Sequence, residues 1–379
     1  MRLLIVTNVA APYRLPLWAE IRAAGVDLTV ALLEPEIATS FGMPEERARD
    51  WQDVGSSEST ETVGLRTWRM TRGEDAYYIA KGDVWSLVRG AEAVIICGWD
   101  SPAFWQFLGA CKVTRTPVLG FYESTLATSS FSGGPIAAAR QFFMRQLDAV
   151  IVPGVAAEES VLDKGVRADR VWRGFNAVDM SGFAAVNSAT DEGARNFLFV
   201  GKLIKRKNVD SILEAFATLP GDCRLSLAGS GAEDEVLRSQ AANLGIADRV
   251  DFLGYTSYAD LPAVMARHGH LLLVSRVEVW GLTVNEGLAA GMHAIVAREC
   301  GVAPSVDGMP GVFLCDPTPE SIAQSMHRSL ADWQGRIQDP PILQHDAAAL
   351  AEVHLRAVDD VLRRKRHTSD VSMPSIPRG

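Results

Sequence analysis

Short runs of apolar residues alternate along the chain with segments in which apolar residues recur every three or four positions. A short continuous apolar run is typical of a buried strand, and a period of 3.6 residues is typical of an amphipathic helix. Regular alternation of the two patterns predicts parallel sheets with crossover helices. The sequence therefore predicts an α/β fold.

The alternation is clear in the first half, except between positions 35 and 73, where the chain is polar and irregular with weak strand character at Thr67–Met70. The expected strands are Leu3–Thr7, Leu28–Leu33, Ala93–Cys97, Pro117–Tyr122 and Ala149–Val152, and the expected helices are Arg14–Ala24, Pro102–Lys112, Pro135–Leu147 and Ala156–Lys164.

A second alternating series starts after a segment rich in Ser, Gly, Ala, Thr, Asp and Glu, between Asp179 and Asn196, which reads as a linker. Its expected strands are Phe197–Gly201, Arg224–Ala228, Val250–Leu253, Leu271–Ser275, Ala294–Ala297 and Val312–Cys315, and its expected helices are Val209–Thr218, Glu233–Leu244, Ala259–Ala266, Leu282–Ala290, Ser321–Asp332 and Ala347–Arg366.

These patterns divide the chain into two Rossmann-like, doubly wound domains. We expect a first domain over residues 1–185, a linker over 186–195, a second domain over 196–345, a final helix over 346–367 and a disordered tail over 368–379. Ligands bind at the carboxyl ends of parallel strands in such sheets, so two domains in tandem should face each other across a cleft.

Composition narrows the classes of function. Hydrophobic residues make up 47% of the chain and charged residues 22%, as in a soluble globular protein. The net charge of −9 is spread over both halves, which argues against a nucleic-acid partner. The N-terminal apolar run is short and reads as a first strand rather than a signal peptide, and no apolar segment reaches about 18 residues without a charge or a proline.

The five cysteines are scattered and form neither a disulfide framework nor a metal-binding spacing, which favours a reducing cytoplasm. The basic segment Arg363–Arg366 closes the last helix pattern. It suits either contact with anionic lipid at the inner face of the membrane or simple complementation of the helix dipole, and both interpretations stay open.

The stretch from Ser275 to Gly291 carries the first candidate chemistry. An apolar strand pattern ends at Ser275 and a helix pattern begins at Gly281, so Glu278 should lie in the loop and Glu286 inside the helix. The free N–H groups of Gly281, Leu282 and Thr283 would favour an anion such as a diphosphate. The two glutamates would then face sugar hydroxyl groups, although they could equally be solvated carboxylates at a helix end.

A basic segment follows the first strand of the second domain. Gly201 ends that strand, and four cations come within the next six positions: Lys202, Lys205, Arg206 and Lys207. Such a cluster suits a leaving diphosphate, whose negative charge grows during transfer, but a solvated basic turn is the alternative. Two further strand ends bear glycines that would let a nucleotide approach closely: Gly229 and Gly231, and Gly254 with Tyr255.

These motifs, in this order, resemble the retaining glycosyltransferases of family 4, a large group with the GT-B fold that transfers sugars from nucleotide-sugars. The resemblance is close over residues 196–300. It is looser in the first half, where it rests on Asn8-x-x-x-Pro12-Tyr13-Arg14 and on Asn176-Ala-Val-Asp179.

The resemblance implies a role for each matching residue. Lys202 and Lys207 would contact the donor diphosphate, Glu278 the transferred sugar and Glu286 the ribose, while the N–H groups of Leu282 and Thr283 hold the distal phosphate. It also implies that the first domain binds the acceptor, with Trp99 and Asp100 candidates for lining that side.

The sequence departs from the family at two places. Val9-Ala10-Ala11 stands where the family has a glycine pair. Many members also have a first-domain histidine near the reacting carbon, whereas all seven histidines here lie beyond position 267. Glu123, at the end of a first-domain strand, is the candidate for that position; a loop or helix-cap carboxylate is the competing interpretation.

The resemblance implies a UDP- or GDP-sugar as substrate, no cofactor, and a glycan, a lipid-linked molecule or a small molecule as acceptor. No Asp-x-Asp occurs, so we expect no metal and assign charge stabilisation to the lysines and the helix terminus. Two rivals remain: a nucleotide-sugar 2-epimerase on the same fold, and a non-catalytic nucleotide-sugar-binding protein.

Overall fold

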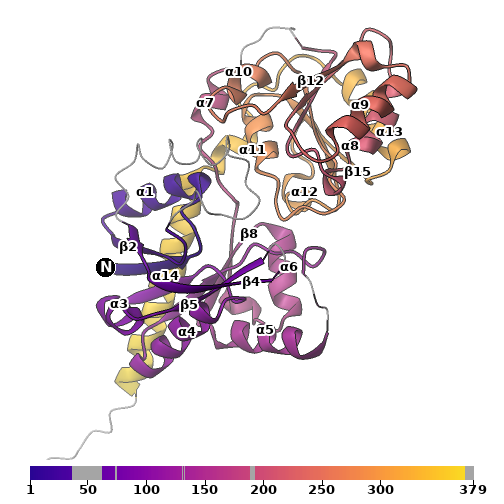
Figure 1. The fold of residues 1–379 in the computed structure, drawn as a ribbon. Coiled ribbons are helices and arrows are strands. Elements are labelled where there is room, and N and C mark those ends of the chain that lie inside the picture. The colour runs from indigo at the N-terminus through magenta and orange to yellow at the C-terminus, as the bar shows by residue number, and fades with distance from the viewer. Residues whose placement is uncertain (36–61, 73–74, 130, 132, 188–192, 372–379) are drawn as a thin grey trace, which may run out of the picture.

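The computed structural model describes residues 1–35, 62–72, 75–129, 131, 133–187 and 193–371. It contains two parallel sheets, each covered by helices, in two domains that lie one beyond the other (Figure 1). The first sheet has the order β3 (Thr62–Gly64), β2 (Asp27–Leu32), β1 (Arg2–Thr7), β6 (Ala93–Ile96), β7 (Val118–Phe121), β8 (Ala149–Pro153) and β9 (Val171–Gly174). The expected fold, two doubly wound parallel α/β domains, is confirmed.

The second sheet has the order β12 (Val250–Gly254), β11 (Arg224–Ala228), β10 (Asn196–Val200), β13 (His270–Leu273), β14 (His293–Ala297) and β15 (Val312–Cys315). The chain starts this sheet in the middle, winds outward on one side and then returns to the other side of β10. The direction of winding therefore changes between β10 and β13. Ligands bind at such a switch point, beyond the carboxyl ends of the strands.

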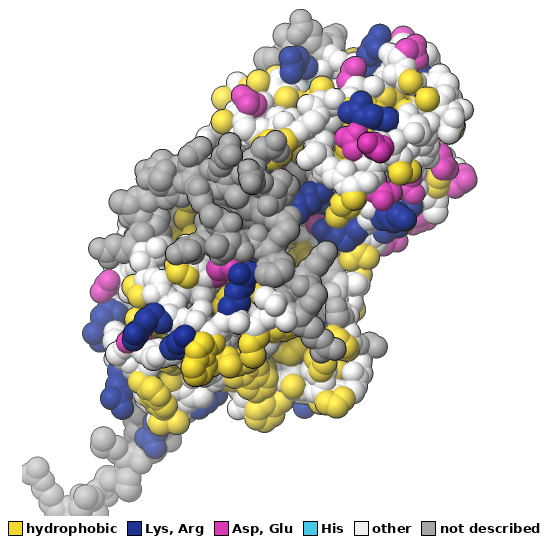
Figure 2. Space-filling model, viewed as in Figure 1, with side chains coloured by type: hydrophobic (Ala, Val, Ile, Leu, Met, Phe, Trp, Pro, Cys, Tyr) yellow, Lys and Arg dark blue, Asp and Glu magenta, His cyan; other side chains and the backbone are white. Residues whose placement is uncertain are grey.

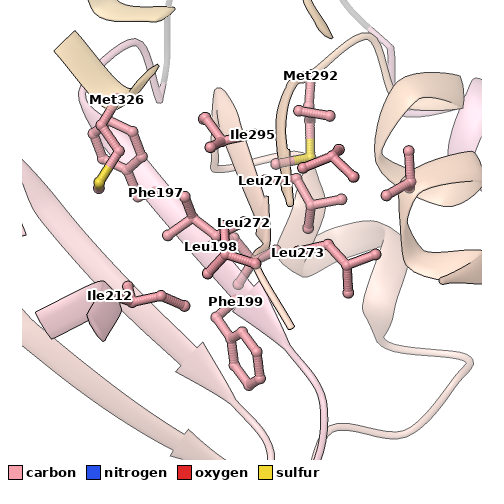
Figure 3. Close-up of a cluster of buried hydrophobic side chains, with 14 of the residues drawn as sticks. Phe197, Leu198, Phe199, Ile212, Leu271, Leu272, Leu273, Met292, Ile295 and Met326 are labelled. Carbon is pink, nitrogen blue, oxygen red and sulfur yellow. The ribbon is translucent and has the colours of Figure 1, made fainter. Parts of the chain in front are cut away.

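Residues of the central strands are buried on both faces of the second sheet. Phe197, Leu198 and Phe199 of β10 and Leu271, Leu272 and Leu273 of β13 are all at most 1% exposed. Figure 3 shows them interleaved with Met292, Ile295 and Met326, and with Ile212 from a covering helix. Burial on both faces explains why these strands read as continuous apolar runs without alternation.

Helices and short turns cover the sheets. The α-helices are α1 (Leu15–Ala23), α3 (Val84–Gly90), α4 (Pro102–Thr114), α5 (Gly134–Gln146), α6 (Val155–Asp163), α7 (Ser181–Ala184), α8 (Val209–Ala217), α9 (Asp234–Asn243), α10 (Leu261–Met265), α11 (Leu282–Ala289), α12 (Ala303–Val306), α13 (Pro319–Ala331) and α14 (Ala347–Val371). The 3-10 turns are Pro12–Arg14, Ala168–Arg170, Lys205–Lys207, Ala247–Arg249 and Pro341–Gln344.

Several elements differ from those expected. Strand β4 (Thr67–Arg72) pairs in antiparallel fashion with β5 (Asp75–Ala80), which the sequence did not predict. Helix α7 lies in the segment read as a linker, of which residues 188–192 are outside the described part. Helix α14 runs past the expected end at residue 367, and of the expected disordered tail residues 372–379 lie outside the described part.

Helix α14 belongs in space to the first domain. It packs on α1, β8 and β9, and Leu350, Val358 and Val361 are part of the apolar cluster under the first sheet (Figure 1). The chain thus crosses between the domains twice, once on the way to β10 and once before α14. The first domain is built from both ends of the chain.

Candidate functional site

Two loops meet at the carboxyl edge of the second sheet, at the switch point between β10 and β13. The N–H of Arg276 donates to the carbonyl oxygen of Arg206 at 2.9 Å, and the Arg276 guanidinium donates to that of Lys205 at 2.8 Å. Arg206 in turn donates to the carbonyl oxygen of Val277 at 3.3 Å. These contacts tie the basic segment to the loop that carries Glu278.

Lys207 and Glu278 form an ion pair at this edge. The hydroxyl of Ser275 donates to the same carboxylate at 3.2 Å, and Arg206 approaches its other oxygen at 3.8 Å. Both partners of the pair are largely buried, with side chains 14% and 13% exposed. The carboxylate is therefore held in one position by three groups, and the solvated-carboxylate interpretation does not hold for Glu278.

The glycines of the neighbouring loops are required by close packing of the backbone. Gly229 has φ +157°, and a Cβ there would overlap the carbonyl oxygen of Gly201; a Cβ on Gly231 would overlap that of Leu203. The N–H of Gly229 donates to the carbonyl oxygen of Gly254 at 2.7 Å. The sequence led us to expect that these glycines admit a nucleotide. Close packing among the loops is by itself enough to require glycine at positions 229 and 231.

Helix α11 begins at this edge, next to Glu278. Gly281 has φ +109°, and a side chain there would overlap Leu273 of β13, so only glycine fits the turn. The backbone N–H groups of Leu282 and Thr283 lie in the first turn, where a helix has no internal acceptors for them. The positive end of the helix dipole lies at these N–H groups and favours a bound anion.

Glu286, one turn further along α11, is buried and hydrogen-bonded to Tyr258. Burial raises the pKa of Glu286 to about 7, and the hydrogen bond from Tyr258 opposes that rise. The same burial, together with the charges of Glu286 and Asp179, raises the pKa of Tyr258. Glu286 is thus a buried carboxyl group near its titration point, and the solvated helix-end interpretation fails for it too.

On the first-domain side of the cleft, Glu123 is held between a cation and an amide. Arg14 forms an ion pair with one of its oxygens, and the side chain of Asn176 donates to the other at 3.0 Å. Burial would lower the pKa of Arg14, but the charge of Glu123 and the Tyr13 side chain raise it above its ordinary value. Glu123 lies in the loop after β7, and it is the centre of a partly buried polar cluster rather than a solvated carboxylate.

This cluster continues across the domain boundary. The side chain of Asn285, on α11, donates to the carbonyl oxygen of Asn176 at 2.8 Å and accepts from the indole of Trp280 at 3.0 Å. A continuous series of contacts therefore runs from Arg14 through Glu123 and Asn176 to the helix whose first turn faces the ion pair. Helix α11, on the donor side, and Glu123, the candidate carboxylate on the acceptor side, are therefore connected through hydrogen bonds of Asn176.

The other first-domain candidates lie at the ends of β1 and β6. Asn8 follows β1, and its buried Oδ1 has no hydrogen-bond partner among the described residues. Pro12, Tyr13 and Arg14 form a 3-10 turn whose arginine lies over the Tyr13 ring.

Trp99 and Asp100 follow β6 and have contacts within the first domain. The carbonyl oxygen of Trp99 accepts from the indole of Trp105 at 2.8 Å, and Arg140 lies over the Trp99 ring. Asp100 accepts from the backbone N–H of Ser101 at 3.1 Å, as a residue at the start of α4.

A histidine from the last helix lies in the first domain. His354, on α14, packs against Phe121 with ring centroids 5.3 Å apart. Burial, followed by the charge of Arg14, lowers its pKa to about 4 although its Nδ1 is 2.9 Å from the carbonyl oxygen of Leu350. The sequence assigned it to a final helix of unknown place; in space it is a buried residue of the first domain, close enough to Arg14 for that charge to lower its pKa.

A cavity of about 340 Å³ opens between the domains beside Glu278. It is lined by Thr125, Leu126 and Ala127 of the first domain and by the segment from Arg298 to Gly301 of the second. Gly301 donates its N–H to the carbonyl oxygen of Glu278 at 3.0 Å, which fixes the cavity next to the ion pair. One carboxylate oxygen of Glu299 is buried there with no hydrogen-bond partner among the described residues.

Tyr258, Trp280, Asn285 and Glu299 were not anticipated from the sequence. Asn285 had a signal, because an amide between Val284 and Glu286 interrupts an apolar helix face. Tyr258 and Glu299 had none, since their relation to the site depends on contacts between distant segments.

Within the described residues, no group of three or more His, Cys, Asp and Glu side chains is arranged to hold a metal ion. No helix in the described part of the chain is both long and apolar enough to cross a membrane.

Comparison with known proteins places this geometry in context. Residues 184–339 match the family model described as glycosyl transferases group 1. The D-inositol 3-phosphate glycosyltransferase of Mycobacterium ulcerans is 31% identical over 198 residues, which is 48% of this chain and 42% of that protein. The lipopolysaccharide core biosynthesis glycosyltransferase LpsE of Rhizobium meliloti is 28% identical over 234 residues, 60% of this chain and 62% of that protein. The match thus spans from two fifths to three fifths of these relatives' length.

Solved structures match nearly the whole chain in fold. Anabaena HepE in complex with UDP has a TM-score of 0.67 at 16% identity and covers 98% of this chain and 100% of its own. The lipopolysaccharide outer core galactosyltransferase WaaB has a TM-score of 0.70 at 14% identity, covering 95% of this chain and 99% of its own. At these identities the likeness concerns the arrangement of the two domains, which is the GT-B fold.

Proposed function

Since residues 184–339 belong to the glycosyl transferases group 1 family and the two domains have the GT-B fold, we propose that this chain is a retaining glycosyltransferase of family 4. It moves a sugar from a nucleotide-sugar to an acceptor hydroxyl. The observation that carries the proposal is the Lys207–Glu278 ion pair beside the first turn of α11. It puts a cation for phosphate, a carboxylate for sugar hydroxyls and a phosphate-binding helix terminus at one sheet edge.

The donor lies along this edge. Lys202, Lys207 and the N–H groups of Leu282 and Thr283 bind the diphosphate, and Glu278 binds the sugar. Glu286 accepts from the ribose hydroxyls, in place of or beside Tyr258. Gly229, Gly231, Gly254 and Tyr255 border the nucleoside. UDP is the first nucleotide to test, because HepE was solved with UDP, and GDP is the second.

Transfer with retention then proceeds by front-side attack. The bond between the anomeric carbon and the donor phosphate oxygen breaks while the acceptor oxygen bonds to the same face of the carbon. The acceptor proton passes to an oxygen of the departing phosphate. Lys202 and Lys207 stabilise the negative charge that grows on the leaving diphosphate, and Glu278 orients the sugar. These groups supply the charge that a metal ion supplies elsewhere, so we propose that the reaction needs neither metal nor cofactor.

The acceptor binds against the first domain, at the cavity beside Glu278. Glu123 is the candidate first-domain residue for this side, and its contacts with Arg14 and Asn176 hold it in one position. A fixed carboxylate suits the orientation of an acceptor hydroxyl. Relatives named for lipopolysaccharide core synthesis and for inositol phosphate support a cell-envelope or exopolysaccharide glycan, a lipid-linked molecule or a small polyol as acceptor. We propose a cytoplasmic location, which the five free cysteines favour.

One assay tests the proposal and its rivals. Purified protein is incubated with UDP-, GDP- and ADP-sugars, with and without EDTA, and released nucleotide, product anomer and recovered donor are followed by chromatography and NMR. Nucleotide release in EDTA and an α-linked product from an α-linked donor support it. Donor epimerised at C2 without an acceptor would identify an epimerase instead. Tight nucleotide binding without turnover of any donor would identify a non-catalytic binding protein.

A further inference from the structure

Hydrophobic side chains gather on the outer surface of the first domain, away from the interdomain cleft. Figure 2 shows them over the part of the molecule that Figure 1 labels α3, α4 and α5. Four of the side chains there are highly exposed for their size: Trp68 (60%), Trp85 (48%), Val113 (72%) and Phe142 (58%). We refer to these four residues, with Met70, as the aromatic patch.

The patch is continuous across four elements. Trp85 of α3 and Val113 of α4 line one cavity of about 410 Å³ together with Trp105. The Trp105 ring stacks on Phe142 of α5, with centroids 6.3 Å apart. At the hairpin end of the patch, Lys81 lies over the Trp68 ring at 5.0 Å. The next residue, Gly82, lines the same cavity as Trp85 and Val113. An apolar surface therefore extends from the hairpin to α5.

The β4–β5 hairpin presents an apolar face to solvent, which is unusual. Its register pairs Trp68 with Ile79 and Met70 with Tyr77, so these four side chains share one face. The opposite face is the buried one, where Tyr78 and Ala80 pack on the domain. That face also carries Thr67, Arg69 and Thr71 of β4, so the more apolar face of the hairpin is the one with Trp68 and Met70.

The charges around the patch are mostly positive although the chain as a whole carries −9. Helices α3, α4 and α5 contain no acidic residue and three exposed basic ones, Arg89, Lys112 and Arg145; their fourth basic residue, Arg140, is buried. Lys81 and Arg115 are further exposed cations at the margins of the patch, and Asp83 is an exposed acidic residue nearby. A protein partner would need an acidic rim, whereas an anionic phospholipid surface offers negative charge and an apolar interior together.

Tryptophan is the side chain that prefers the boundary between water and lipid, because its ring is apolar and its N–H is polar. Basic side chains beside it lay their stems on the apolar surface and keep their charges among the headgroups. The cavity between Trp85, Trp105 and Val113 has room for an acyl-chain segment. We propose that the aromatic patch docks the protein on an anionic membrane surface.

Two residues of the basic segment at the end of α14, the earlier candidate for lipid contact, make contacts within the protein. Lys365 forms an ion pair with Asp148 at 2.8 Å, and Arg364 pairs with Asp360 and donates to the carbonyl oxygen of Asp169. These contacts hold α14 to the first domain. The proposal for the aromatic patch holds whether or not the proposed transferase activity is confirmed.

Vesicle binding by the full chain tests the docking surface. Sucrose-loaded vesicles of phosphatidylcholine alone, or mixed with phosphatidylglycerol, are sedimented with the protein. We expect binding to the mixed vesicles that weakens with salt, and far less binding to phosphatidylcholine alone. Each of the variants Trp85→Ser and Phe142→Ser should weaken binding roughly tenfold. Val236→Ser on α9, where the side chain is 60% exposed, is the matched control and should bind as the wild type does.

A double variant, Lys81→Glu with Arg89→Glu, separates the charges from the apolar contact: it should lose the preference for phosphatidylglycerol. Wild-type protein that fails to bind mixed vesicles, or a loss in Val236→Ser equal to that in Trp85→Ser, would overturn the proposal. So would a concentration-dependent dimer that Trp85→Ser abolishes, because the patch would then be covered by a second copy. Far-UV circular dichroism of each variant, and sugar transfer to a soluble acceptor, keep this outcome distinct from failure of the fold or of the enzyme.

Discussion

Lys207 and Glu278, which lie 71 positions apart in the chain, form a direct ion pair at the carboxyl edge of the second sheet. The two residues were expected to face different parts of the donor, one the diphosphate and the other the sugar. In the structure each sets the position of the other, because the Ser275 hydroxyl and the contacts of Arg276 fix the loop around them. The boundary between phosphate and sugar in the proposed donor site is therefore this ion pair itself.

Substitution of either partner should abolish turnover without unfolding the protein. Lys207→Ala and Glu278→Gln each remove one side of a largely buried pair, which we expect to cost about 1–3 kcal/mol in the free energy of unfolding. Turnover should fall by roughly 10²–10³, the effect of losing one charge-stabilising group. Nucleotide release from the donor identified by the panel, measured with urea unfolding, checks both effects.

Lys205→Ala is the matched control for this pair. Lys205 lies on the same turn with an exposed side chain, and its carbonyl oxygen still accepts from Arg276 after the change. Its turnover should stay within about twofold of wild type. Wild-type rates in Lys207→Ala and Glu278→Gln would remove both residues from the mechanism.

Glu286 should make the stability of the protein depend on pH between its unfolded and folded pKa values. Burial raises the folded pKa from 4.5 to about 7, so over that interval the folded protein binds a proton that the unfolded chain has released. The contribution to stability is complete below pH 4.5 and is lost as the pH rises through about 7. Glu286→Gln, which is neutral throughout, should flatten this dependence and be more stable than wild type at pH 8 by roughly 1–3 kcal/mol.

Urea unfolding from pH 5 to pH 8 measures this slope. Tyr258→Phe removes the hydrogen bond that holds the pKa of Glu286 down, so the fall in its stability should continue to a higher pH than in wild type. Glu235→Gln, at an exposed position of α9, should leave the wild-type slope unchanged. An identical slope in wild type and Glu286→Gln would contradict the raised pKa.

Asn285 should contribute more to stability than its size suggests. Asn285→Ala leaves two buried groups, the Asn176 carbonyl and the Trp280 indole, without the partners that the structure gives them. We expect a loss of roughly 2–4 kcal/mol, read from the urea midpoint. Asn243→Ala, at an exposed position of α9, should change it by less than about 0.5 kcal/mol. Equal effects in the two variants would mean that the contacts of Asn285 across the domains do not contribute to the stability of the fold.

Gly229 is the glycine least able to accept a side chain. Gly229→Ala would place a Cβ against the Gly201 carbonyl at a φ that L-residues rarely adopt, so the two loops must separate. We expect a cost of at least about 2–3 kcal/mol and weaker nucleotide binding by isothermal titration calorimetry. Gly221→Ala has no atom within 4 Å of the new Cβ and should be within about 1 kcal/mol of wild type. Wild-type stability in Gly229→Ala would show that the loops adjust freely.

Most of the fold followed from hydrophobic periodicity. The bounds of β11 and β15 match those expected, because both strands are short apolar runs bounded by polar residues. Strand β5 was missed because its run of Ala76, Tyr77, Tyr78 and Ile79 has no polar positions to mark a face. The predicted bounds of α14 were nearly right. Periodicity indicates that a helix has an apolar face, but it does not indicate which domain that face covers.

The donor side of the site was predictable to the level of residue types, and its contacts were not. Motif order placed Lys207, Glu278 and Gly281 at one edge, since the carboxyl ends of parallel strands must meet there. The pairing of Lys207 with Glu278 and of Arg14 with Glu123 depends on which rotamers two loops allow each other. That information is spread over segments far apart in the chain, and no local pattern carries it.

The return of α14 to the first domain affects how this protein is made. Leu350, Val358 and Val361 fill the core under the first sheet, yet they are translated after the whole second domain. The first domain therefore emerges from the ribosome with part of its core uncovered, and it stays so until the second domain has been synthesised. During synthesis the later domain is the one able to fold first, and completion of the earlier one is the last step.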